Sequence, residues 1–321
     1  MVPVSICLVT YNRSAALPKT LESLLAQRFG DFELIISDDY STDNTEEVCR
    51  EYQQRDSRVK YFRNTSNLSM PGNLNVAIRR ARGTYIANLH DGDVYSPDLI
   101  GKWKDALDHI NTAVLVFNHY QRLLPDGHLS IFKMPFDGRV AGKEIALHFF
   151  RTLTSCVWGA VMIRSSALAR AGLFDPTFGF ISDVDMWLRL MRYADAAYIP
   201  EPLITLGPKE ADHPWRRLHW RSAFWTFGMY KRHLETYRGL FPDLESRWRA
   251  RYALTCRLYF LKNMLSLVKH GRWDRVREGL AMWKDAQDPV LRTLGHCLPH
   301  NTWQPAWYDA SCWSVATLAE L

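Results

Sequence analysis

The chain has 321 residues, 47% of them hydrophobic and 23% charged, with a net charge of +6, as in many globular proteins. No stretch approaches the ~18–20 apolar residues of a membrane-spanning helix, and the short apolar run at 2–10 lacks a preceding basic residue. We therefore expect a cytoplasmic protein without a signal peptide. The six cysteines are scattered without a CxxC pair, so neither a zinc site nor a disulfide framework is predicted.

The first 120 residues alternate short apolar runs with helical patterns. Strands are predicted at 4–10, 32–37, 59–62 and 85–89, and helices at 15–27, after 41–43 and at 73–81. This alternation is typical of a largely parallel sheet flanked by helices, so the predicted fold class is α/β.

The pattern changes along the rest of the chain. A helix at 97–110, strands at 113–118 and 157–163 and a helix at 183–193 are predicted first. After Pro208 long helical patterns are predicted at 215–236, 243–269 and 274–285, and the last thirty residues are not assigned. We predict a main domain over 1–208 and a helical extension over 209–321.

The extension is basic and rich in tryptophan. Between Trp215 and Lys284 there are 16 Lys/Arg residues against 5 Asp/Glu residues. This imbalance favours an anionic partner such as a lipid phosphate or membrane surface, and the alternative is a solvated helical face. The tryptophans are explained either by a helical core or by stacking on sugars. No recognisable nucleic-acid module accompanies the basic residues, so no nucleic-acid partner is predicted.

Acidic pairs occur where chemistry is expected in an open α/β sheet. Asp91-Gly92-Asp93 directly follows the strand at 85–89, and Asp38-Asp39 ends the strand at 32–37. Asp183 and Asp185 begin a helix. Taken singly, these pairs are also explained as turns and helix caps. Two carboxylates joined by a glycine suit Mg²⁺ or Mn²⁺, which prefer oxygen ligands.

The order of these segments resembles the family 2 glycosyltransferases, in particular bacterial polysaccharide and spore-coat-type enzymes. The similar segments are VSICLVTYNR, LESLLAQRFGDFELIISDDYSTDNT, NLNVAIRRARGTYIANLHDGDVYSPDLI, GAVMIRSSALARAGLFD and SDVDMWLRL, between Val4 and Leu206. The resemblance implies a GT-A (Rossmann-like) fold over 1–208 that binds a nucleotide-sugar.

The resemblance also implies residues for the nucleotide. Thr10 and Tyr11 are expected to line the nucleotide pocket, and Asp39 to accept a hydrogen bond from the ring NH of the base. Asn75 and Arg79, or its neighbour Arg80, are expected on the helix that closes the pocket. A UDP-sugar is the first expectation for the donor and a dTDP-sugar the second.

Metal and catalytic residues follow from the same resemblance. Asp91 and Asp93 match the DxD-type motif, so they are expected to contact the ribose and hold Mn²⁺ or Mg²⁺ at the donor diphosphate. His213 is a candidate further metal ligand, with a surface histidine as the alternative. Asp183 matches the general base of an inverting displacement, and Asp185 is the alternative base.

His90 and Ser182 depart from the resemblance, because acidic residues are common at both positions. The function expected is transfer of a hexosyl or N-acetylhexosaminyl group to a glycan or lipid-linked glycan, with peripheral contact at the inner membrane face. The departures keep open a non-catalytic protein that binds nucleotide-sugars or glycans. The sequence leaves the oligomeric state open.

Overall fold

The computed structural model describes residues 2–124, 127–152, 155–207 and 261–285, and a few positions between 229 and 258. Its contacts divide the chain into two compact units, Met1–Glu245 and Ser246–Leu321. The domain boundary predicted at 208 borders residues outside the described ranges and stays a prediction.

The described part of the first unit forms a sheet of ten strands in the order β3-β2-β1-β4-β9-β6-β10-β5, with β7 on β6 and β8 on β10. The strands are β1 (Val4–Thr10), β2 (Phe32–Asp38), β3 (Val59–Arg63), β4 (Tyr85–His90), β5 (Val94–Tyr95), β6 (Ala113–Leu123), β7 (Leu129–Phe132), β8 (Gly138–Val140), β9 (Val161–Arg164) and β10 (Asp195–Leu206). The α/β class is confirmed.

The sheet has a parallel half and a mixed half. In the first half β3, β2, β1 and β4 run parallel, as predicted for the first 120 residues. In the second half β9 lies antiparallel between β4 and β6, while β10 runs parallel to β6. The strand ends of the parallel half therefore share one edge of the sheet.

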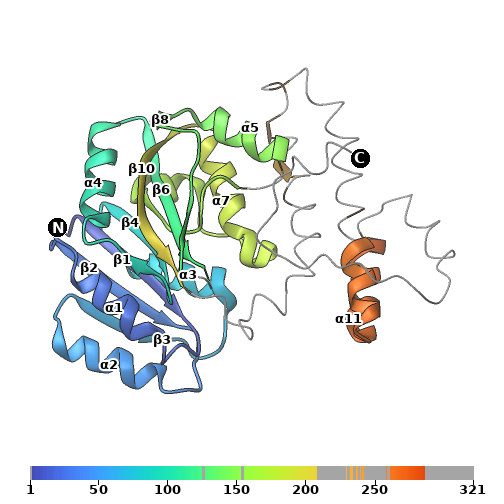
Figure 1. Cartoon of the computed structure of the whole chain (residues 1–321), viewed down its shortest axis with the longest axis horizontal. Coiled ribbons are helices and arrows are strands. Elements are labelled where there is room, and N and C mark those ends of the chain that lie inside the picture. The colour runs from blue at the N-terminus through green and yellow to red at the C-terminus, as the bar shows by residue number, and fades with distance from the viewer. Residues whose placement is uncertain are drawn as a thin grey trace. The chain divides into compact units, whose positions relative to one another are not determined.

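Helices cover both faces of the sheet (Figure 1). They are α1 (Leu17–Leu25), α2 (Thr45–Arg55), α3 (Ser69–Arg80), α4 (Leu99–His109), α5 (Gly142–Thr152), α6 (Ser165–Ala171) and α7 (Ser182–Met191), with a 3₁₀ helix, η1, at Pro176–Ile181. Residues of α1, α2 and α4 form one hydrophobic core with the sheet, and residues of α3, α5, α6 and α7 form another. Alternating side chains of β1 supply both cores, with Ile6 and Leu8 on one face and Cys7 and Val9 on the other.

The described part of the second unit is helical, over 261–269 and in α11 (Trp273–Asp285). The helix predicted at 274–285 is confirmed, while the helix predicted at 215–236 and most of the one at 243–269 fall on residues outside the described ranges. Trp273 at the start of α11 is 52% exposed and so is not a core residue. Among the described residues, no helix combines the length and apolar character needed to cross a membrane.

Candidate active site

The candidate site begins at the edge where β1, β2 and β4 end. Thr10 at the end of β1 stands opposite Asp38 of β2, and Val9 stands opposite His90 of β4. Because these strands are parallel and in register, the segments that follow them emerge together. The structure thus brings Thr10, Asp39 and the Asp91-Gly92-Asp93 turn to one edge.

The Asp91-Gly92-Asp93 turn is held by its neighbours. Gly92 has a φ of +86°, a conformation that glycine adopts at little cost. The Thr20 hydroxyl accepts a hydrogen bond from the Gly92 amide at 2.9 Å and donates one to the Asp93 carbonyl at 2.8 Å. The Gly207 amide donates to Asp93 Oδ1 at 2.9 Å. These bonds fix the direction of the Asp93 carboxylate.

Charged side chains surround the two carboxylates of this turn. Arg13 Nε lies 3.7 Å from Asp91 Oδ1, and His90 Nδ1 lies 3.7 Å from Asp93 Oδ2. Burial raises the pKa of Asp91, and the Arg13 guanidinium and Thr10 hydroxyl offset part of that rise. Burial lowers the pKa of His90, but the neighbouring carboxylates outweigh it and the net shift is upward. An imidazole thus lies beside the two carboxylates at a position where the sequence resemblance leads one to expect an acidic group.

Asp39 is nearly buried, with 3% of its surface exposed. Its Oδ1 accepts hydrogen bonds from the Leu68 amide at 2.7 Å and from Asn64 Nδ2 at 3.1 Å. Burial raises its pKa, and these donors oppose the rise. Beside it, Arg63 lies over the half-exposed Tyr40 ring, 4.5 Å from its centroid. The carboxylate is therefore held in a fixed position next to an exposed aromatic ring.

Asp183, in the first turn of α7, has its carboxylate close to the His90 ring. A Cβ added at Gly159 would lie 2.8 Å from His90 Nε2 and 3.3 Å from Asp183 Oδ2, so both side chains border the same small space. Asn88 Nδ2 donates to the Gly159 carbonyl at 2.8 Å and holds that glycine in place. Burial raises the pKa of Asp183 to about 6, although His90 opposes the rise.

Asp185, two residues further along α7, is fully buried and already paired. Its Oδ2 accepts from Arg189 Nε at 2.8 Å, and its Oδ1 lies 2.9 Å from His233 Nε2. This carboxylate joins α7 to the segment around 233. Of the two candidate bases, only Asp183 borders the space beside His90.

An aromatic cluster next to this space was not predicted from the sequence. Trp158, with 36% of its surface exposed, has its ring centroid 6.4 Å from that of His90 and 5.1 Å from that of Tyr120. Tyr120 in turn stacks on Phe132 at 4.7 Å. Trp158 directly precedes Gly159, and its aromatic face lies beside His90. The pairing of β6 with β7 brings Tyr120 and Phe132 opposite each other, and a cross-strand search for aromatic pairs would have found them.

Other predicted residues lie elsewhere or have other contacts. Asn75 bonds through both ends of its amide to the Phe174 backbone, at 2.8 and 3.0 Å, and so ties α3 to the segment before α7. Arg79 is exposed near the end of α3, about 15 Å along the helix from its start near Asp39. Tyr11 is half-buried in the loop after β1. His213 lies outside the described residues.

The carboxylates at the turn fit a divalent metal shared with a substrate. No group of three or more His, Cys, Asp or Glu side chains within the described ranges could hold a metal ion alone. Mg²⁺ and Mn²⁺ sites at phosphates commonly use only one or two protein carboxylates, with phosphate oxygens and water completing the shell. Asp91 and Asp93 supply that number, and they are the residues that would hold such an ion.

Comparison with known sequences identifies the family of this site. The model of glycosyl transferase family 2 matches residues 5–172, just over half of the chain. An uncharacterized glycosyltransferase of Rickettsia typhi is 28% identical over 203 residues, which cover 63% of this chain and 62% of that relative. The chain thus spans less than two-thirds of the length of this relative.

Solved structures share the fold. Residues 1–349 of Staphylococcus aureus TarS, in complex with UDP-GlcNAc, superpose with a TM-score of 0.57 at 14% identity, over 89% of this chain and 93% of that one. A mannosyltransferase from Pyrobaculum calidifontis, in complex with GDP-Man and Mn²⁺, gives a TM-score of 0.57 at 17% identity, over 91% of this chain and 82% of that one. The expected GT-A fold is confirmed.

Proposed function

This chain belongs to glycosyl transferase family 2, and we propose that it transfers a sugar from a UDP- or dTDP-sugar to a hydroxyl group of a glycan acceptor with inversion at the anomeric carbon. One observation carries the proposal. Asp39 and the Asp91-Gly92-Asp93 turn meet at one sheet edge, and Asp183 borders the same space as His90 behind that turn.

Donor binding is assigned to the strand ends. Asp39 is held where it can accept the ring NH of uracil or thymine. The exposed Tyr40 and the half-buried Tyr11 would flank the base. Asp91 and Asp93 would hold Mn²⁺ or Mg²⁺ at the diphosphate. A divalent ion there would neutralise negative charge on the departing nucleoside diphosphate. The Mn²⁺ and nucleotide-sugars named for the two neighbour structures support this assignment.

Asp183 is assigned as the general base. The acceptor hydroxyl oxygen forms a bond to the anomeric carbon while the bond from that carbon to the diphosphate oxygen breaks. The hydroxyl proton passes to the Asp183 carboxylate, and the bonding electrons leave with the nucleoside diphosphate. A pKa of about 6 suits this task, because the group is ionised at neutral pH and yet basic enough to accept a proton.

The acceptor is assigned to the aromatic side of the site. The half-exposed face of Trp158, supported by Tyr120, offers an apolar surface on which a sugar ring can stack beside Asp183. We extend the proposal to acceptors carried on a lipid at the cytoplasmic face of a membrane, because the segment from 215 to 284 carries a strong excess of basic residues.

Asp183→Asn tests the enzymatic assignment. Replacing a general base typically lowers turnover by about 10²–10⁴-fold, so we expect this loss in sugar transfer measured over a panel of UDP-, dTDP- and GDP-sugars with Mn²⁺. Donor affinity should stay close to wild type. Asp105→Asn, at an exposed position on α4, is the matched control and should leave both unchanged. Near-native turnover of Asp183→Asn would show that the base is misassigned, and nucleotide binding by wild type without turnover would favour the binding protein.

A further inference from the structure

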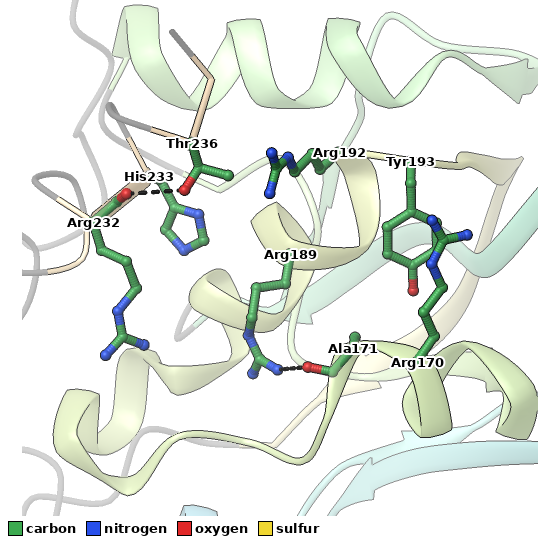
Figure 2. Close-up of a pocket in the computed structure, with 8 residues that line it drawn as sticks. All are labelled: Arg170, Ala171, Arg189, Arg192, Tyr193, Arg232, His233 and Thr236. Carbon is green, nitrogen blue, oxygen red and sulfur yellow. Dashed lines mark hydrogen bonds between the residues drawn. The ribbon is translucent and has the colours of Figure 1, made fainter.

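A cavity with a volume of about 570 Å³ lies away from the proposed donor site. It is bordered by α6, α7 and the segment around 233 (Figure 2). Its lining residues are Arg170, Ala171, Arg189, Arg192, Tyr193, Arg232, His233 and Thr236. The lining thus contains four arginines and a histidine, and it contains no carboxylate.

The cavity is separate from the proposed catalytic site. Asp183 begins α7 and Arg192 caps its end, so the helix rise places them about 13 Å apart along the axis. Asp185 lies between them, and its carboxylate faces Arg189 and His233. A ligand in this cavity would therefore not occupy the space beside His90.

Among the residues that the structure describes, positive charge exceeds negative charge around the cavity. The described carboxylates that contact the lining are Asp185, paired with Arg189, and Asp175, 2.6 Å from Arg232. Two carboxylates against four guanidinium groups leave a surplus of two positive charges. The C-terminal ends of α6 and α7 carry partial negative charge of about half a unit each, which offsets only part of that surplus.

Two lining arginines have no acidic partner among the described residues. Arg170 lies over the Tyr193 ring, 3.8 Å from its centroid, and forms no ion pair there. Arg192 forms neither a hydrogen bond nor an ion pair within the same described ranges, and its guanidinium is turned toward His233 and Thr236 (Figure 2). The other two, Arg189 and Arg232, are paired with Asp185 and Asp175. Arg189 also donates a hydrogen bond to the Ala171 carbonyl at 2.6 Å.

His233 supplies an independent sign of a missing ligand. The residue is 1% exposed and its Nε2 is paired with Asp185, but its buried Nδ1 has no hydrogen-bond partner among the described residues. A buried polar atom without a partner costs about 1–3 kcal/mol, so such atoms are uncommon unless a bound group satisfies them. The ring lies among the basic residues that line the cavity (Figure 2).

We propose that this cavity binds a phosphate-bearing anion, of the phosphate or diphosphate class, at a site distinct from the donor site. Guanidinium groups match phosphate oxygens through paired hydrogen bonds, and a cluster of several arginines is suited to a group with more than one negative charge. The phosphate belongs either to a free compound or to a lipid headgroup.

Calorimetric titration with inorganic pyrophosphate tests the proposal. The buffer contains a chelator and no divalent metal, so that the Asp91-Gly92-Asp93 turn does not recruit the probe. Wild type should bind one pyrophosphate. The affinity of Arg192→Ala should be lower by about tenfold or more, because a charge-assisted hydrogen bond is lost. Arg170→Ala should weaken binding in the same direction. Arg277→Ala, at an exposed position on α11, is the control for net charge and should bind like wild type.

One further variant and one further probe sharpen the result. Asp93→Ala should bind pyrophosphate like wild type, which separates this site from the donor site. Absence of pyrophosphate binding, or equal affinity in Arg192→Ala and wild type with equal melting temperatures, would overturn the proposal. Binding to vesicles of phosphatidylcholine, with and without phosphatidic acid, distinguishes a lipid headgroup from a free phosphate compound. Loss of vesicle binding in Arg192→Ala identifies a lipid headgroup, and loss of pyrophosphate affinity alone identifies a free phosphate compound.

Discussion

At the scale of single residues, the protonation of Asp183 gives a measurable pH dependence. Its pKa in the folded protein is about 6, above the ordinary value of 3.8, because burial disfavours the charged carboxylate. A general base acts only when ionised, so kcat/KM should rise about tenfold per pH unit below 6 and level off above it. The measurement is kcat/KM from pH 4.5 to 8, with donor affinity followed in parallel. The assignment would be contradicted if kcat/KM fell only near pH 4, or if its fall with pH matched a fall in donor affinity.

Trp158 provides a second test at this scale. Trp158→Ala removes the exposed aromatic face beside His90, and a lost stacking contact of about 1–1.5 kcal/mol should raise the acceptor KM about tenfold. The donor KM should change less, because the ring contacts of Trp158 are with His90 and Tyr120 and not with the carboxylates assigned to the donor. Trp158→Phe keeps an aromatic ring and should recover most of the affinity. An unchanged acceptor KM in the alanine variant would show that the acceptor lies elsewhere.

The acidic residues of the candidate site could be predicted because each follows a recognisable element. Asp39 and the Asp91-Gly92-Asp93 turn come after apolar runs, and the parallel sheet then dictates that they meet. Trp158 and Gly159 could not be placed in this way, since their role depends on the approach of β9 to β4. The resemblance favours Asp183 over Asp185 as the base, but the different surroundings of the two carboxylates do not follow from the sequence. Their difference depends on His233, which is 48 positions away from Asp185.

At the scale of elements, the close contact between Gly207 and the Asp91-Gly92-Asp93 turn gives a further test. A Cβ at Gly207 would lie 2.1 Å from the Gly92 carbonyl oxygen, which is backbone and cannot rotate away. Gly207→Ala should therefore displace the turn, lower donor affinity and destabilise the fold by about 1–3 kcal/mol. Gly30→Ala is the control, because its Cβ would meet nothing within 4 Å. Equal donor affinity and equal melting temperatures for the two variants would contradict the role of Gly207.

Among the elements, β10 shows what the sequence pattern leaves out. No strand is predicted at 195–206. Pro200 and Pro202 in this segment lack the amide hydrogens of a regular ladder. The structure accommodates them by shifts of register between β10 and β6 around Pro202. The strand forms because β6, β8 and β5 pair with it on either side of that irregularity. This long-range pairing is absent from local sequence patterns.

At the scale of the whole molecule, the sheet and its two hydrophobic cores explain how distant segments form one site. The core on the face of α1 and α4 fixes β4 and the turn that follows it, while the core on the face of α7 fixes Asp183. The fold class follows from the alternating pattern of the first 120 residues, but the meeting of the two halves depends on tertiary packing.

The most direct test of this account is the binding of UDP, dTDP and GDP to wild type and Asp93→Ala, with and without Mn²⁺. If the Asp91-Gly92-Asp93 turn holds the metal at a donor diphosphate, wild type should bind UDP or dTDP only weakly without Mn²⁺ and tightly with it. Asp93→Ala should lose the Mn²⁺-dependent part, and Asp105→Ala, an exposed aspartate on α4, should keep it. Absence of nucleotide binding under every condition, or Mn²⁺-dependent binding of equal strength in Asp93→Ala, would contradict the proposed donor site.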